Sequence, residues 1–254
     1  MADAIQKEAD LLRARVLLST EFSPSGPVKS KDLFSGRLNE IVTVLSAVSQ
    51  PGQHVVLFGE RGVGKTSLAS LIHEFWVTYA KGADKLLSLR YNCEPFDTFV
   101  SIWSNISEMM VDSFEKAGIP VPNGSSWEEI FDDVRNNNAS PHTIRRLFDL
   151  ANRRFVIVVD EFDQIEDQET TRLFASTIKT LSDNLIHATL IIVGVADTVD
   201  ELISDYKSIE RPLAQILLPR MTTEESAEII NRAYGVTGLQ AAQGVIDYMA
   251  RLAQ

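Results

Sequence analysis

Residues 55–66 of the chain read VVLFGERGVGKT, and this segment combines three features. The apolar run Val55–Phe58 predicts a short buried strand. Residues 59–66 then fit the pattern G-x-x-x-x-G-K-[ST], which is typical of a phosphate-binding loop. Apolar residues at helical spacing from Leu68 to Trp76 follow and predict a helix. A strand, a glycine-rich loop and a helix in this order favour nucleotide binding over a glycine-rich turn that matches by chance.

Each residue type of the loop suits a bound phosphate. Gly59, Gly62 and Gly64 permit backbone turns that a Cβ would block. Their N–H groups can then form an anion nest, reinforced by the positive end of the following helix. Lys65 brings a mobile positive charge, and the Thr66 hydroxyl suits Mg²⁺. The segment that we expect to contact the nucleotide also includes Glu60, Arg61, Val63 and Ser67.

The composition describes an ordinary globular chain with an acidic balance. Of the 254 residues, 44% are hydrophobic and 23% are charged, and the net charge is −11. This charge argues against a broad basic surface for nucleic acid, although it leaves a local patch open. No apolar run reaches about 18 residues, so we expect no membrane contact. The single Cys93 fits a reducing cytoplasm, and we expect a small buried hydrophobe there rather than a nucleophile.

Predicted strands and helices alternate along the chain. The sequence predicts strands at 55–58, 86–91, 155–159, 189–193 and 216–218, and mostly helical structure over 95–151. Alternating strands and helices imply a parallel sheet that is covered on both faces. Right-handed crossovers then bring Gly59, Asp160 and Asp197 to one edge of the sheet.

The second chemical signal follows the most apolar strand, where residues 155–161 read FVIVVDE. Asp160 can hold Mg²⁺ through its carboxylate oxygens. Glu161 can polarise an attacking water, and a solvated surface acid is the alternative reading. We expect Asp163 to cap the next helix.

Three further residues each have two readings. Asn92 can hydrogen-bond Glu161 and restrain it until a partner binds, or it can simply form a turn. Asp197 can orient water or sense phosphate, or it can cap the helix that follows. Arg211 can face the nucleotide of an adjacent subunit, or it can form an ordinary salt bridge. Arg220 is a weaker candidate for the same role as Arg211.

Together these motifs resemble the AAA+ superfamily of P-loop ATPases. More narrowly, the chain is similar to the branch shared by STAND-type signalling ATPases and origin-recognition or replication-initiator ATPases. The resemblance runs from about Phe34 to the C-terminus. Its segments are FSGRLNE at 34–40, GERGVGKT at 59–66, VVDEFD at 158–163, IIVGVAD at 191–197 and IERPLAQILLPRMTTEE at 209–225.

The resemblance implies an αβα sandwich with a five-stranded parallel sheet in the order 5-1-4-3-2, followed by a partial helical lid. It implies three segments: an N-terminal helical arm and linker at 1–33, a nucleotide-binding core at 34–219 and the start of the lid at 220–254. It also implies ATP or ADP with Mg²⁺ as cofactors. The implied roles are an adenine pocket at Gly36 and Arg37, Walker A at Lys65 and Thr66, Walker B at Asp160 and Glu161, sensor 1 at Asp197 and an arginine finger near Arg211.

The chain departs from the family pattern in three places. Sensor 1 is usually Asn, Ser or Thr, so Asp197 implies slow or differently organised hydrolysis. The helical segment between Asn92 and Phe155 is longer than in a minimal core and is a candidate partner surface. The lid is expected to continue beyond Gln254, together with its sensor 2 residue.

Three functions compete at this point. The leading hypothesis is an ATP-dependent conformational or assembly switch with slow hydrolysis, acting as a homo-oligomer or with a partner or effector subunit. Analogy alone connects such a switch to signalling or antiphage defence. The second is a DNA-handling ATPase of the replication-initiator or transposition-regulator type, which the net charge does not support. The third is a nucleotide-holding module without turnover. The choice of ATP over GTP rests on the resemblance alone.

Overall fold

The structure is a computed structural model, and it describes residues 12, 13, 16, 37–80, 85–136, 138–203, 206–237 and 241–252. The chain divides into two compact units, one of which is Leu38–Pro219. The other comprises Met1–Arg37 and Arg220–Gln254. Most of the arm expected at 1–33 lies outside the described residues. No helix among the described residues is both long and apolar enough to cross a membrane.

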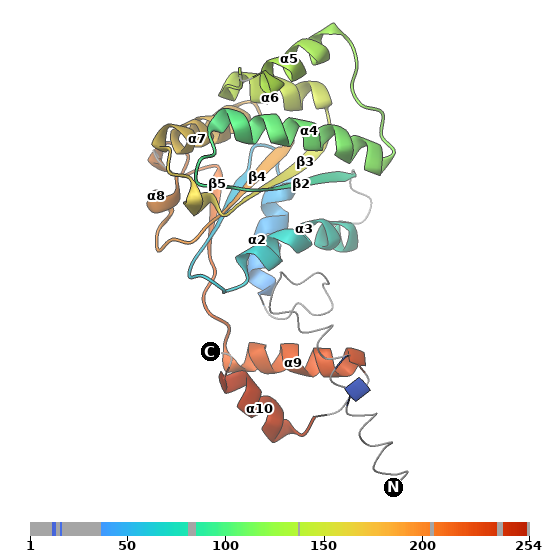
Figure 1. The fold of residues 1–254 in the computed structure, drawn as a ribbon, viewed down its shortest axis with the longest axis vertical. Coiled ribbons are helices and arrows are strands. Elements are labelled where there is room, and N and C mark those ends of the chain that lie inside the picture. The colour runs from blue at the N-terminus through green and yellow to red at the C-terminus, as the bar shows by residue number, and fades with distance from the viewer. Residues whose placement is uncertain are drawn as a thin grey trace. The chain divides into compact units, whose positions relative to one another are not determined.

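Strands and helices alternate through the larger unit (Figure 1). In chain order they are α2 (Leu38–Ser49), β1 (His54–Phe58), α3 (Lys65–Tyr79), β2 (Leu86–Asn92), α4 (Phe99–Ala117), α5 (Ser125–Arg135), α6 (Pro141–Ala151), β3 (Arg154–Asp160), α7 (Gln168–Asp183), β4 (Ala188–Val193), α8 (Val199–Leu202) and β5 (Leu213–Leu217).

The strands form one parallel sheet in the order β2-β3-β4-β1-β5. This is the predicted order read from the other edge, so the expected P-loop α/β fold is confirmed. The fifth strand begins earlier than the sequence suggested, at Leu213 instead of Ile216. Because β5 is an edge strand, Gln215 and Leu217 remain exposed, and the strand lacks the continuous apolar run that marks a central strand.

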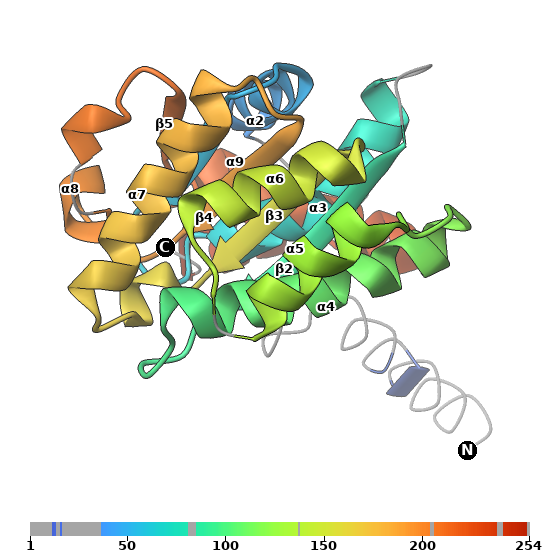
Figure 2. The same ribbon diagram turned by 90° about the horizontal axis from the view of Figure 1, so that it is seen from above.

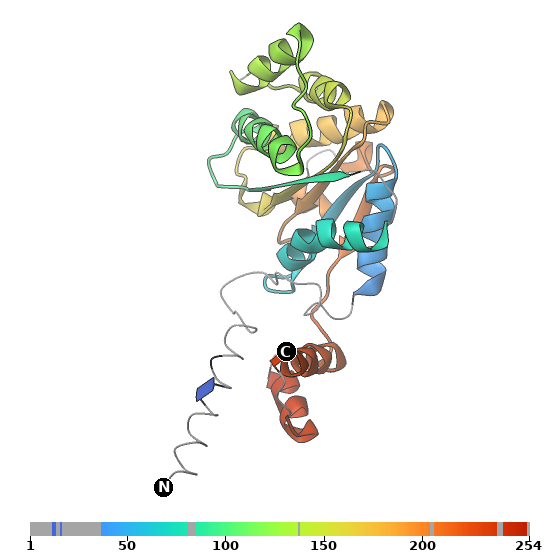
Figure 3. The same ribbon diagram turned by 90° about the vertical axis from the view of Figure 1, so that its right-hand side faces the viewer.

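Helices cover both faces of the sheet (Figures 2 and 3). One face packs on α4, α6 and α7 around an aromatic core, in which the Trp103 ring stacks on Phe174 with centroids 5.9 Å apart. Residues Leu87, Leu89, Ile157 and Val159 point to this core. Because side chains alternate along a strand, the other residues of β2 and β3, including Arg90 and Asp160, point to the opposite face. That face lies against α2 and α3.

The smaller unit contains the two C-terminal helices, α9 (Thr223–Thr237) and α10 (Gln243–Leu252). Ile230 of α9 packs against Ile246 and Ala250 of α10 in a small core of their own. Two helices were expected here, at 222–233 and 238–252, and the structure extends the first and shortens the second.

Candidate nucleotide-binding site

The glycine-rich loop begins where β1 ends, between the ends of two neighbouring strands. Phe58 accepts a backbone hydrogen bond from Leu218, and Leu57 accepts one from Gly194. Gly59 adopts a φ of 136°, and a Cβ at this position would lie 2.5 Å from the carbonyl oxygen of Leu218. Only glycine therefore fits where the loop leaves the sheet.

Helix α3 begins directly after the loop with an uncapped first turn. Gly64 adopts a left-handed φ of 94°, and no side-chain hydrogen bond caps the helix among the described residues. The first N–H groups of a helix lack intrahelical partners and carry a partial positive charge. The start of α3 is consequently suited to an anion. Around it, Glu60 and Arg61 are exposed, and Val63 is buried.

The side chain of Lys65 folds back over the loop. Its Nζ donates to the carbonyl oxygens of Gly59, at 2.8 Å, and Glu60, at 2.7 Å. Burial lowers the pKa of Lys65, while the carboxylates of Asp163 and Asp160 counteract that shift. An ammonium group carries three donors, so one donor remains for a ligand while the other two brace the loop.

Asp160 ends β3 and faces the phosphate loop, as the sequence predicted. Its side chain is 2% exposed, and its Oδ1 accepts from the Thr66 hydroxyl at 3.2 Å and from the Glu161 backbone N–H at 2.9 Å. Its Oδ2 pairs with Nη2 of Arg90 at 2.9 Å. The loop and the acidic pair, 94 residues apart in sequence, thus meet in one site.

The pair formed by Thr66 and Asp160 fits a magnesium ion that is shared with phosphates. No cluster of three or more His, Cys, Asp or Glu side chains suited to a metal exists among the described residues. A complete protein cage for a metal is therefore missing from that part of the chain. Mg²⁺ commonly takes only one or two protein oxygens and completes its coordination with water and substrate phosphates. A hydroxyl and a carboxylate side by side match that requirement.

Glu161 follows Asp160 in a left-handed conformation, with φ 55° and ψ 36°. A non-glycine residue with positive φ is uncommon and is held by its surroundings. Its side chain is exposed, unlike that of Asp160. The strained backbone therefore turns one carboxylate into the protein and leaves its neighbour in solvent.

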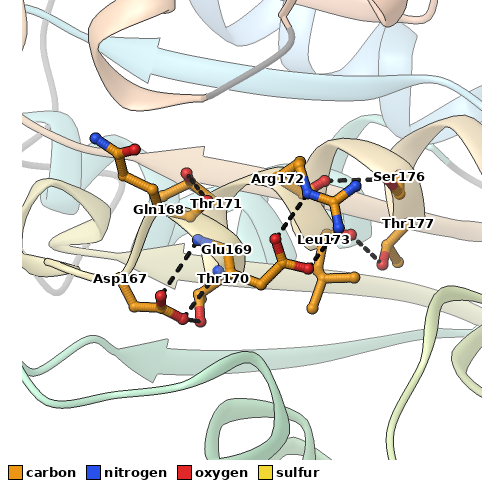
Figure 4. A network of polar contacts seen from close by, with 9 residues as sticks. All are labelled: Asp167, Gln168, Glu169, Thr170, Thr171, Arg172, Leu173, Ser176 and Thr177. Carbon is orange, nitrogen blue, oxygen red and sulfur yellow. Dashed lines mark hydrogen bonds and ion pairs between the residues drawn. The ribbon is translucent and has the colours of Figure 1, made fainter.

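Asp163 does not cap the next helix, and that prediction is wrong. Asp167 is the N-cap of α7 and accepts from the backbone N–H groups of Glu169 and Thr170 (Figure 4). Asp163 lies one helical turn too early, and its Oδ1 instead accepts from the backbone N–H of Val195 at 2.8 Å. It thereby joins the segment after β3 to the segment after β4.

Asn92 and Asp197 both lie near the carboxyl edge of the sheet. Asn92 pairs in register with Asp160, and no hydrogen bond joins its exposed side chain to Glu161 in the described part of the chain. Asp197 is exposed and directly follows Ala196, which bridges to Gly59. Thr198 is the N-cap of α8, so Asp197 does not hold the capping position that was its alternative.

Asp197 instead has a backbone link to the next helix. Its N–H donates to Oε2 of Glu201 at 2.9 Å. That bond lowers the pKa of the Glu201 carboxyl. The backbone at Asp197 is thus anchored, one residue after the bridge to Gly59 at the start of the loop.

Arg211 lies at the other end of the sheet. It precedes Pro212, whose carbonyl accepts from the backbone N–H of His54 at the start of β1. The five residues of β1 rise by about 3.3 Å each, which places Arg211 roughly 16 Å from Gly59 along the strand direction. Arg211 is exposed, and it lies too far from Gly59 to contact the phosphate loop of its own chain.

The remaining predicted positions belong to the smaller unit or lie outside the described residues. Gly36 lies outside them. Arg37 is the first described residue before α2, with φ 57°. Arg220 is exposed and begins the C-terminal segment of the smaller unit. Within the larger unit, Cys93 is buried in the aromatic core, and burial raises its pKa, which fits the expected hydrophobic role.

Sequence reasoning missed Arg90, the ion-pair partner of Asp160. Strand β2 reads LLSLRYN, and Leu86 and Ser88 precede Arg90 on the strand face that lies against α3. The Arg90 side chain is 33% exposed, so Arg90 is a partly buried charge inside an edge strand. A carboxylate on the neighbouring strand is a natural partner for such a charge, and its place in the strand was the available signal.

Comparisons with known proteins agree with this fold. By structure, the chain is similar to the Walker-type ATPase PABY2304 of Pyrococcus abyssi, with a TM-score of 0.64, 17% identity, and coverage of 93% of this chain and 67% of that one. It is similar to Cdc6p from Pyrobaculum aerophilum, with a TM-score of 0.58, 18% identity, and coverage of 91% and 57%. It is also similar to the Aeropyrum pernix ORC1 protein, solved in complex with DNA, with a TM-score of 0.54, 17% identity, and coverage of 87% and 53%.

The chain therefore spans between about half and two thirds of the length of these structures. At these identities the likeness shows the fold alone. No curated protein matches the chain. The model of a family described as Novel STAND NTPase 1 matches residues 27–253, nearly the whole sequence. The chain belongs to this Novel STAND NTPase 1 family.

Proposed function

We propose that the protein is a Mg·ATP-binding ATPase that acts as a nucleotide-dependent conformational or assembly switch. The observation that carries the proposal is the direct contact between the two motifs. Thr66 of the phosphate loop donates to Asp160 at the end of β3, and Lys65 is folded over the same loop. The membership of the chain in an NTPase family supports the same reading.

Each residue of the site has a separate role in this proposal. The loop N–H groups and Lys65 bind the phosphates, and Thr66 with Asp160 would hold Mg²⁺. When bound, the metal neutralises charge on the transferring phosphoryl group. Glu161, adjacent to Asp160 and exposed, orients and deprotonates the attacking water. Asp197 follows Ala196, which bridges to the start of the loop, and we expect its negative charge near the phosphates to slow turnover.

The division of the chain into a larger and a smaller unit suits a conformational switch. Arg211 lies too far from its own site, so full activity requires a second molecule that supplies the arginine. Residues 220–254 act as the start of a lid, and Gly36 and Arg37 contribute to the adenine pocket. These roles, the choice of ATP and any part in signalling or antiphage defence come from family resemblance.

The replacement of Glu161 by Gln tests the proposal. The variant E161Q keeps the shape of the side chain but loses the base, so phosphate release should fall by about 10²- to 10³-fold. Binding of Mg·ATP should be unchanged, because the loop and Asp160 remain intact. The control is E166Q, which changes another exposed acid shortly after β3 and should behave as the wild type.

Two results would contradict the proposal. If wild type and E161Q release phosphate equally slowly while both bind Mg·ATP, the chain is a nucleotide-holding module without turnover. If neither binds Mg·ATP, the site assignment itself is wrong.

A DNA-handling ATPase is the alternative that structural likeness keeps open. One similar structure was solved with DNA, although at 17% identity it shares the fold alone. The net charge of −11 speaks against extensive phosphate contacts. A DNA affinity that falls steeply with rising salt concentration would favour this alternative.

A further inference from the structure

Arg90 connects Asp160 to the helix that follows the phosphate loop. Its Nη2 lies 2.9 Å from Oδ2 of Asp160, and its Nη1 donates to Oγ of Ser70 at 3.0 Å. Ser70 in turn donates to the backbone carbonyl of Thr66 at 2.7 Å. Arg90 therefore reaches both the metal-binding carboxylate and the first turns of the helix that follows the phosphate loop.

The two carboxylate oxygens of Asp160 have different hydrogen-bond partners. Oδ1 is shared with Thr66, the other residue suited to the metal, and with the Glu161 backbone. Oδ2 is held by Arg90. Because Asp160 is 2% exposed, its negative charge requires a partner inside the protein. Arg90 provides this partner from within the chain.

Arginine suits this position better than lysine would. Its planar guanidinium binds Ser70 and Asp160 at the same time, whereas an ammonium is a single point charge. The Nε atom of Arg90 is buried without a hydrogen-bond partner among the described residues. This unsatisfied donor subtracts from the stability that the ion pair contributes.

We propose that Arg90 is a built-in counter-ion for Asp160, which holds the carboxylate in place before nucleotide binds and weakens its attraction for Mg²⁺. This proposal rests on the proposed function of the same site. A positive charge next to Asp160 cancels part of the negative charge that a divalent cation meets. The protein therefore keeps its site folded without metal, and it requires a higher Mg²⁺ concentration for loading.

The test follows binding of a fluorescent ATP analogue over a Mg²⁺ concentration series, together with the melting temperature of the protein without added ligand. In R90Q the Mg²⁺ concentration at half-saturation should fall by about tenfold, because the competing charge is gone. The melting temperature without ligand should fall by roughly 4–8 °C, because Asp160 loses its partner, and Mg²⁺ with nucleotide should restore most of that loss.

A matched control is R154Q, which removes a half-buried arginine from the neighbouring strand. Arg154 donates to the carbonyl of Val48 and lies over the Trp76 ring, at the opposite end of β3 from Asp160. R154Q should lower the melting temperature without changing the Mg²⁺ requirement. If R90Q does not fold alone, R90M, which keeps much of the side-chain volume without the charge, carries the test with the same expected decrease in half-saturating Mg²⁺.

The outcomes separate the two proposals. If wild type binds the analogue and replacement of Arg90 by an uncharged residue leaves the Mg²⁺ requirement unchanged, Arg90 forms an ordinary structural salt bridge and this inference is wrong. If wild type binds no nucleotide at any Mg²⁺ concentration, the proposed function fails and the inference falls with it.

Discussion

The two ends of the parallel sheet differ in which charged side chains they bury. At the carboxyl end, Lys65 and Asp160 are buried, and each is held by hydrogen bonds within the site. At the amino end, His54 is buried and neutral, and Arg211 is exposed. The carboxyl end thus buries its charges within one molecule, whereas the amino end exposes Arg211, whose proposed role in catalysis requires a second molecule.

The largest expected effect tests whether the amino end acts across molecules. Replacement of Arg211 by Ala should lower phosphate release by roughly 10³-fold and leave nucleotide binding intact, because an arginine finger acts on the transition state. Mixing R211A with E161Q should restore activity to at least about tenfold above either variant alone. In the mixture, an intact Glu161 in one chain can meet an intact Arg211 from the other.

The matched control is R153A, which removes another exposed arginine at the amino end of the sheet, directly before β3. It should leave phosphate release unchanged. Activity that stays strictly proportional to protein concentration, with no recovery on mixing, would count against a contribution from a neighbouring molecule.

The next effect concerns the geometry of the carboxyl end. In G59A the new Cβ would meet the Leu218 carbonyl at 2.5 Å, so the variant should lose about 3 kcal/mol of stability. Gly118 also has positive φ, but no atom of the described residues would lie within 4 Å of a Cβ there, its immediate neighbours aside. G118A should therefore cost only about 1–2 kcal/mol, from backbone strain alone. Urea unfolding of both variants checks this, and equal losses would show that contact with Leu218 does not restrict the loop.

The smallest effect concerns His54 at the amino end. Its Nδ1 accepts from the backbone N–H of Leu190 at 3.0 Å, and burial lowers its pKa to about 3. The unfolded chain, with a histidine pKa near 6.5, binds more protons between pH 6.5 and pH 3. Stability should therefore fall as the pH drops below about 6.5, by about 2 kcal/mol between pH 6.5 and pH 5.

The variant H54N isolates this contribution. An Asn oxygen can accept the Leu190 N–H bond but does not bind a proton in this range. Urea unfolding at several pH values should give the variant a shallower loss of stability than wild type. Parallel pH profiles for the two proteins would show that His54 does not carry the effect.

The sequence predicted most strongly those features that depend on neighbours in the chain. The phosphate loop and the apolar strand that ends at Asp160 follow from local patterns, the strand order follows from the family that those patterns resemble, and the structure confirms the fold. The start of β5 was missed because an edge strand alternates between buried and exposed residues. Asp163 was misassigned because an acid shortly before a helix resembles a cap, and its true partner, Val195, follows another strand.

The role of Arg90 in the site could not be predicted from local sequence patterns for the same reason. Its partner Asp160 is 70 residues away, and only the pairing of β2 with β3 brings the two together. Local propensity contains no information on such a pair. The charge of an arginine inside a strand points to a partner, while the sheet order decides which carboxylate it is.

The most direct test of the central claim is calorimetric measurement of Mg·ATP binding to the wild-type chain and to K65A. The account predicts one Mg·ATP bound per wild-type chain and a loss of that binding in K65A, since Lys65 braces the loop and is proposed to bind the phosphates. A wild-type chain that takes up no Mg·ATP, or a K65A variant that binds it equally well, would contradict the account.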